Sequence, residues 1–137
     1  MFAGCTSLSV DVSNWHPSTS LYNTFYKCKK VTGLSTWDIS QITEFWYTLS
    51  MAGFDITELQ QWDVSTIPTM EGLFYCTFTD TCNSSISYCD LSKWNTSKLT
   101  GASNMFAGDS ALITIDISNF MLDNATITDM FYGCTSL

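Results

Sequence analysis

Three acidic residues occupy equivalent places in the sequence and could together hold a metal ion. Glu58, Asp90 and Asp116 each precede an apolar residue in a stretch where polar and apolar residues alternate. If these stretches are neighbouring parallel strands, the three carboxylates form one outward column with a spacing of about 4.8 Å. Such a column suits a hard cation such as calcium or the lysines of a partner. The alternative is a solvated surface whose charges are screened by salt.

The six cysteines predict disulfide bonds rather than a zinc site, because no Cys-x-x-Cys pair occurs. Cys5 and Cys28 hold the same place in neighbouring repeats, and stacking would bring them within the Cα separation of a disulfide. Cys76, Cys82 and Cys89 border a longer segment, and one pair among them would fix its ends. Such bridges would indicate an extracellular setting. The alternative is that the repeated cysteines are small buried apolar residues.

Little in the sequence could support catalysis. The single histidine, His16, stands beside Pro17 at a predicted corner. With no second histidine in the chain, the sequence shows no recognisable Ser-His or Cys-His catalytic arrangement. The acidic residues recur with the repeat and cluster nowhere in the sequence. We therefore expect that the protein is not an enzyme and, apart from calcium, has no cofactor.

Three Asn-x-Ser/Thr tripeptides are candidate glycosylation sites, headed by Asn83, Asn95 and Asn124. The chain is so rich in serine and threonine that chance alone gives about two such tripeptides. Asn83 is the best acceptor of the three, because it lies in the longer segment between two repeats.

The charge is one-sided: 13 acidic residues face five lysines and no arginine, for a net charge of −8. Nucleic acid is excluded as a partner, because phosphate binding requires clustered basic side chains. No apolar run reaches the roughly 18 residues that a membrane span requires. Met1 already belongs to a repeat, so we expect the chain to be an interior part of a longer protein.

A repeat would position all of these residues. Met1–Leu8 and Met130–Leu137 share seven of eight residues, and a third copy spans Met105–Leu112. Weaker copies begin at residues 24, 48 and 73, so the starting points are 23, 24, 25, 32 and 25 residues apart. This spacing is typical of one solenoid coil per repeat. The 32-residue unit contains an insertion over 77–87, and the whole chain, 1–137, is predicted to be a single domain of about five coils.

Each repeat has the same internal pattern. Alternating residues predict a parallel strand over 10–15, 32–37, 57–62, 89–94 and 115–120. Its inward residues are Val12, Leu34, Leu59, Leu91 and Ile117, and its outward residues are Asp11, Gly33, Glu58, Asp90 and Asp116. A second short strand and about one helical turn, ending at glycine, complete the coil. The predicted fold class is a repeat solenoid of the leucine-rich-repeat-like or β-solenoid type.

An aromatic residue closes every predicted strand, and stacking would align these residues in one column. The column consists of Trp15, Trp37, Trp62, Trp94 and Phe120. Because one repeat cannot bury its own apolar edge, stacked neighbours would form the core. We expect the column to be part of this core; the alternative is a platform on which sugars stack.

The motif Met-Phe-x-Gly-Cys-x-Ser-Leu, followed by a strand of the form apolar-Asp-apolar-Ser-x-Trp, resembles the BspA-like leucine-rich-repeat surface proteins. It is similar to the form found in surface lipoproteins of mycoplasmas and gut bacteria and in some protists. The resemblance spans the whole chain. The sequence departs from the family pattern at Thr48–Gly53 and at the insertion over 77–87. It implies a solenoid on a cell surface, a role in adhesion or protein binding, and no catalytic residues.

These observations predict a non-catalytic, extracellular or cell-surface repeat protein that contacts a protein or another ligand on a host or cell surface through one face. Two alternatives stay open. The first is a structural fibre subunit that assembles end to end, because the chain starts and ends at the same point of the repeat. The second is a glycan-binding module.

Overall fold

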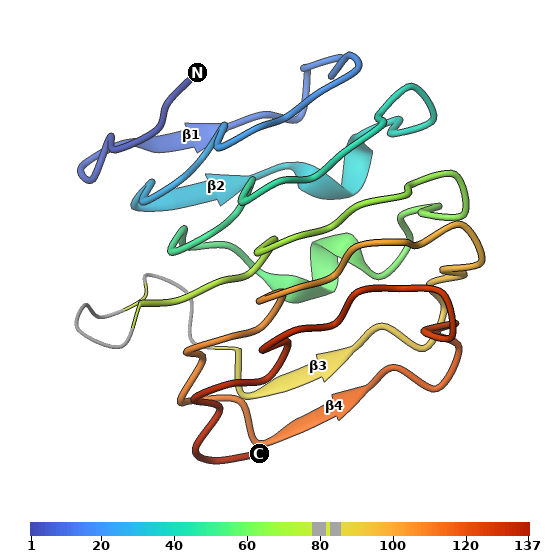
Figure 1. The fold of residues 1–137 in the computed structure, drawn as a ribbon. Coiled ribbons are helices and arrows are strands. Elements are labelled where there is room, and N and C mark those ends of the chain that lie inside the picture. Colours follow the sequence, from blue (N-terminus) through green and yellow to red (C-terminus); the bar gives the residue numbers. More distant parts are fainter. Residues whose placement is uncertain (78–81, 83–85) are drawn as a thin grey trace.

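The computed structural model describes residues 1–77, 82 and 86–137. Strand β1 (Ser9–Asp11) pairs in parallel with β2 (Lys30–Thr32), and β3 (Tyr88–Asp90) pairs in parallel with β4 (Thr114–Asp116). Two short 3-10 helices, η1 (Leu34–Thr36) and η2 (Ile56–Leu59), lie between these pairs. Successive turns of the chain lie one below another, with the two termini at opposite ends (Figure 1). No helix among the described residues is long and apolar enough to cross a membrane.

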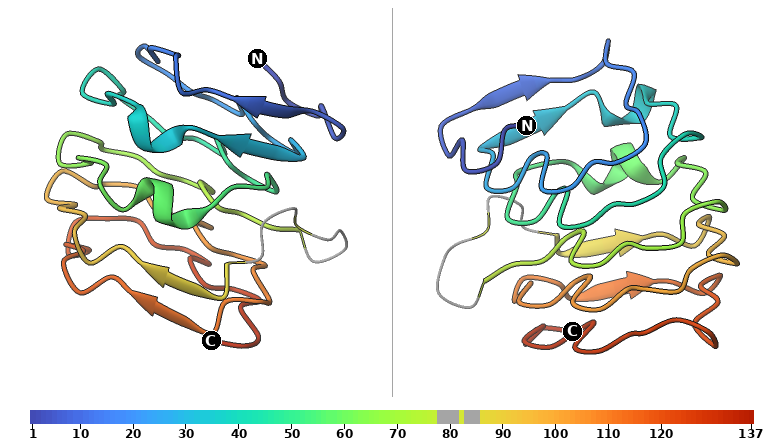
Figure 2. Two further views of the ribbon diagram at one scale, coloured as in Figure 1. Left: turned by 180° about the vertical axis from the view of Figure 1, so that it is seen from behind. Right: turned by 45° about the horizontal axis from the view of Figure 1, so that its top comes forward.

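A second set of parallel contacts joins the repeats on the opposite side of each turn. Single-residue bridges connect one residue of every repeat with its equivalent in the next. They link Ser20 to Glu44, Glu44 to Thr69, Thr69 to Gly101, and Gly101 to Thr126. Each repeat therefore lies beside its neighbour in sequence, and this layered arrangement is visible from two further directions (Figure 2).

The strands begin earlier than predicted and are shorter, because an aspartate side chain ends three of the four, β1, β3 and β4. Asp11 accepts a hydrogen bond from the Ser13 amide (3.0 Å), and Asp90 does the same for Ser92 (3.0 Å). This Asx turn diverts the backbone from the ladder. In the third repeat η2 stands where a strand was predicted. Four of the five predicted inward residues are fully buried, and Ile117 is half-buried; the four are Val12, Leu34, Leu59 and Leu91.

Turns replace the predicted second strand. In the repeats that contain Asp38, Asp63 and Asn95, this side chain accepts a hydrogen bond from the amide two residues later. The amide of Ile42 then donates to the carbonyl of Ile39 (2.9 Å), which closes a further turn. The apolar residues of these segments are nevertheless buried; they are Ile39, Ile42, Val64, Ile67 and Leu99.

The Met-Phe segments are turns rather than helices. In the segment around Phe25, residues Asn23 (φ 50°) and Lys27 (φ 61°) have left-handed backbone. Alternate amides donate to the next repeat: Asn23 to the carbonyl of Trp46 (2.9 Å) and Phe25 to that of Thr48 (3.0 Å). The intervening amide of Tyr26 donates within its own repeat, to Asn23 (3.3 Å). In a helix, all of these backbone amides would donate within their own segment. Here alternate amides donate to the neighbouring repeat instead and so join the two repeats.

The tryptophan column is part of the core, as predicted. Trp37 and Trp62 stack with ring centroids 6.1 Å apart, and Trp62 and Trp94 with centroids 6.4 Å apart. All three are at most 6% exposed, whereas Trp15 and Phe120 at the two ends of the column are half-buried. Each indole N–H donates to a carbonyl of the preceding repeat, for example Trp62 to Leu34 (2.9 Å). The column therefore links repeats by stacking and by hydrogen bonds at once.

Candidate functional site

The three predicted calcium ligands are not gathered into one group in the described part of the chain. Asp90 and Asp116 are register partners in the β3–β4 pair, so the predicted column is correct there. Glu58 lies in η2, and its Oε2 accepts a hydrogen bond from the Leu34 amide (2.6 Å). Among the described residues, no group of three or more His, Cys, Asp or Glu side chains could hold a metal ion. Asp11 pairs with Thr32 rather than with Gly33, which is one position away from the prediction.

Most of the aspartates have a local structural role. In eight Asx turns, the side-chain Oδ1 accepts a hydrogen bond from the amide two residues later. These turns are headed by Asp11, Asp38, Asp55, Asp63, Asp90, Asn95, Asp109 and Asp116. Hydrogen bonds from Ser65 hold the pKa of Asp63 below its usual value, and those from Ser92 do the same for Asp90. The recurring Asp-x-Ser motif is thus explained by turn formation.

The same turn accounts for one candidate glycosylation site. Asn95 accepts a hydrogen bond from the Ser97 amide (3.0 Å), in the place where the preceding repeats have Asp38 and Asp63. Its Asn-x-Ser tripeptide is therefore a variant of the Asx turn. Asn124 is exposed, and Asn83 lies outside the described residues.

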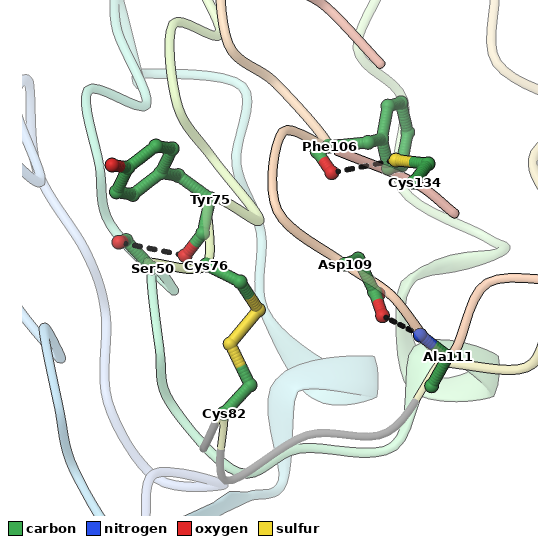
Figure 3. Close-up of a disulfide and its surroundings, with 8 residues drawn as sticks. All are labelled: Ser50, Tyr75, Cys76, Cys82, Phe106, Asp109, Ala111 and Cys134. Atoms are coloured by element: carbon green, nitrogen blue, oxygen red, sulfur yellow. Dashed lines mark hydrogen bonds between the residues drawn. A yellow bond between two sulfur atoms is a disulfide. The ribbon is translucent and has the colours of Figure 1, made fainter. Parts of the chain in front are cut away.

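One disulfide is present, between two of the three cysteines that border the longer segment. Cys76 is bonded to Cys82, with 5.8 Å between their Cα atoms (Figure 3). The predicted bridge between Cys5 and Cys28 is absent. Instead, the Cys28 thiol donates to the Phe2 carbonyl (3.4 Å), while Cys5 is exposed. Cys28 is buried, as expected for a small apolar residue at this place in the repeat.

Asp109 is a buried carboxyl that the sequence patterns did not single out. It takes the place that Cys5, Cys28 and Cys134 hold in their repeats, and it is 3% exposed. Its Oδ1 accepts from the Ala111 amide (3.2 Å; Figure 3), while its Oδ2 has no hydrogen-bond partner among the described residues. Burial raises the pKa of Asp109 to about 6. The signal in the sequence was the exchange of Cys for Asp in a Met-Phe-x-Gly-Cys copy.

The thiols near Asp109 are not activated. Burial raises the pKa of Cys89 to about 12, and the neighbouring charge of Asp109 acts in the same direction. Burial also raises the pKa of Cys134, whose thiol donates to the Phe106 carbonyl (3.1 Å). A nucleophilic cysteine requires the opposite shift. His16 is exposed and is the only histidine in the chain.

A partly exposed group of aromatic and acidic side chains lies beside the single-residue bridges. Tyr22 is 56% and Trp46 is 41% exposed, and their rings meet edge to face with centroids 5.4 Å apart. Tyr47 and Tyr75 form a similar pair, 5.6 Å apart, and both are partly buried. We call Tyr22, Trp46, Tyr47 and Tyr75, together with Glu44 and Glu71, the aromatic surface.

The backbone places these side chains on one side. Glu44 is a bridge residue in extended structure, and Trp46 follows it by two residues, so both side chains point to the same face. The amide of Tyr47 donates to the carbonyl of Glu71 (2.9 Å), which brings the next repeat alongside. The ring of Tyr47 lies on Gly72, where a Cβ atom would be 2.4 Å from the ring. The Tyr47 ring can therefore pack here only because residue 72 has no side chain.

Tyr47 is unusual for its position in the repeat. Its φ is 50°, in the left-handed region, where the equivalent residues are Asn23, Gly72, Asn104 and Asp129. Those types tolerate left-handed backbone, whereas a bulky aromatic residue is strained there. Burial raises the pKa of Tyr47, with further contributions from Tyr75 and from the negative charge of Glu71. The sequence keeps an aromatic ring here against the local preference.

Comparison with known proteins identifies a family. The family model described as Mycoplasma protein of unknown function, DUF285, matches residues 19–137. No curated protein and no solved structure matches the chain. The match covers most of the length and includes every repeat bridge from Ser20 to Thr126. The chain therefore belongs to the DUF285 family.

Proposed function

We propose that this chain is a repeat solenoid that acts as a non-catalytic binding module on the cell surface, where it mediates adhesion or protein–protein contact. The parallel bridges that link every repeat to the next support the solenoid assignment. The resemblance to BspA-like surface proteins supports the location and the role in adhesion. The raised pKa values of Cys89 and Cys134 and the lone histidine support a function without catalysis.

The aromatic surface is the observation that carries this proposal. Most large aromatic rings of the chain contribute to the core, but Tyr22 and Trp46 meet each other in solvent. Exposed aromatic pairs with polar neighbours are typical of protein interaction sites, where tyrosine and tryptophan supply much of the binding energy. The buried tryptophan column cannot serve as a sugar platform, because Trp37, Trp62 and Trp94 are at most 6% exposed.

An adhesion assay tests the proposal. Beads coated with the protein would be scored for attachment to cultured animal cells, with Tyr22→Ser/Trp46→Ser as the test variant. Tyr88→Ser is the matched control, because Tyr88 is 60% exposed and lies on β3, away from the aromatic surface. We expect the test variant to lose most of the attachment while its melting temperature and that of the control stay unchanged. Full attachment by the folded test variant would show that this surface is not the binding site.

A further inference from the structure

The charges around Trp46 indicate which kind of partner fits the aromatic surface. Glu44 precedes Trp46 by two residues on the same face, and Glu71 holds the place of Trp46 in the next repeat. Glu44 Oε1 accepts a hydrogen bond from the Ser20 hydroxyl (2.6 Å), and the side chain of Glu71 lies against Gly101. Neither carboxylate is part of an ion pair within the described part of the chain. Both thus keep their negative charge available to a partner.

These two glutamates differ from Glu58 and from the aspartates that head Asx turns. Each aspartate that heads an Asx turn accepts a hydrogen bond from a backbone amide of that turn, for example Asp63 and Asp90. Glu58 accepts one from the Leu34 amide at the start of η1. Glu44 and Glu71 accept no hydrogen bond from a backbone amide in the described residues. The negative charge beside the exposed rings is therefore not compensated by backbone donors of the described residues.

The face of an exposed tryptophan ring attracts cations, and nearby carboxylates strengthen that attraction. A contact of a cation with a tyrosine ring occurs among the described residues: the Lys27 ammonium lies 5.5 Å from the ring centroid of Tyr26. From these observations we infer that the aromatic surface recognises a protein segment bearing several lysine or arginine side chains, which contact the exposed ring of Trp46 and the carboxylates of Glu44 and Glu71. This inference rests on the function proposed above and names its partner class.

The arrangement of the rings favours a cation over a sugar. A sugar stacks best on one broad, uncovered ring face, whereas Tyr22 and Trp46 meet at an interplanar angle of 80°. The net charge of −8 also attracts a basic partner over longer distances.

Binding of a labelled tetralysine peptide, followed by fluorescence polarisation at low and moderate salt, tests this inference. The test variant Glu44→Gln/Glu71→Gln removes two charges from the aromatic surface. Its matched control, Asp123→Asn/Asp129→Asn, removes two exposed charges elsewhere. We expect binding to weaken about fivefold or more in the test variant and by less than twofold in the control. Trp46→Leu should weaken it about two- to fivefold, and Tyr88→Leu should leave it unchanged.

The outcomes separate this inference from the proposed function. Equal weakening in both double variants would show general charge attraction and would overturn the inference. If cell attachment requires Tyr22 and Trp46 but tetralysine does not compete for it, the partner is not cationic, and a neutral glycan becomes the candidate. Attachment that is independent of both rings would instead overturn the proposed function. Competition by tetralysine, lost in Glu44→Gln/Glu71→Gln, would support the inference.

Discussion

The two sets of tryptophan side chains in this chain have opposite environments. Trp37, Trp62 and Trp94 recur at one place in the repeat, stack on each other and donate their indole N–H groups to the preceding repeat. Trp46 does not belong to this column. It is 41% exposed, and its indole N–H has no hydrogen-bond partner among the described residues. The interior tryptophans connect neighbouring repeats by stacking and hydrogen bonds. The indole N–H of Trp46 and much of its ring surface are instead available to a binding partner.

The difference shows where this repeat allows variation. The interior column keeps an aromatic residue in every repeat, because each ring packs on the next one. The equivalents of Trp46 differ in type: one is another aromatic residue, Tyr22, and the others are the polar residues Glu71, Ser103 and Thr128. A place that the fold does not restrict can be adapted to a partner. The departures from the repeat are therefore where we locate function, and the following predictions test this division.

The largest expected effect is on the interior column. Trp62→Ala removes a ring that stacks on both neighbours and leaves the Leu34 carbonyl without its donor. We expect the free energy of unfolding to fall by about 3–5 kcal/mol, measured by urea denaturation. Trp46→Ala should change it by about 0.5 kcal/mol or less. Similar losses in both variants would break the division between structural and exposed tryptophans.

The next prediction concerns the support beneath the aromatic surface. Gly72 and Gly4 both have left-handed backbone, with φ values of 58° and 78°. A Cβ at Gly72 would meet the Tyr47 ring at 2.4 Å, whereas a Cβ at Gly4 would meet nothing within 4 Å. Gly72→Ala should cost about 2–4 kcal/mol, from backbone strain and overpacking together. Gly4→Ala should cost only the strain, about 1–2 kcal/mol, and equal losses would show that Tyr47 is not packed on Gly72.

A third prediction compares a buried carboxyl with the exposed ones. Asp109 has a raised pKa of about 6, above the unfolded value near 3.8. Its contribution is therefore most favourable below about pH 4 and is lost as the pH rises through 6. Asp109→Asn should raise stability at pH 7 by about 2 kcal/mol and flatten the pH dependence between 4 and 6. Thermal unfolding at several pH values measures this, and an unchanged profile would show that Asp109 is not buried in its charged form.

Part of this organisation was predictable from the sequence, and the reasons are physical. The repeat boundaries and the buried column could be predicted, because stacking requires the same apolar residue in every copy. The predicted strand lengths were wrong, because alternation does not reveal that Asp11 or Asp90 turns the backbone two residues later. The predicted helical turns were wrong because left-handed residues such as Asn23 and Lys27 interrupt them.

The candidate site was less predictable than the fold. Glu58, Asp90 and Asp116 were chosen because they repeat, but Asp90 and Asp116 head Asx turns and Glu58 accepts a hydrogen bond from the Leu34 amide. Trp46 and Tyr47 follow no repeat, so periodicity could not identify them. Their exposure and the Gly72 beneath Tyr47 become apparent only when neighbouring repeats are placed side by side.

The smallest expected effect is at an Asx turn on the surface. Asp63 accepts a hydrogen bond from the Ser65 amide (3.1 Å), and the equivalent place in the next repeat is already occupied by Asn95, which makes the same bond. Because an amide oxygen replaces the carboxylate oxygen as acceptor, Asp63→Asn should leave the melting temperature at pH 7 nearly unchanged. The hydrogen bonds from Ser65 lower the pKa of Asp63, so its stabilising contribution is present at neutral pH and is lost on acidification; the Asn variant should lose that acid sensitivity. Asp63→Ala removes the acceptor and should lower the melting temperature measurably. If Asp63→Asn and Asp63→Ala lower it equally, the charge of Asp63 matters more than its turn, and the outward aspartates would regain a role beyond local structure.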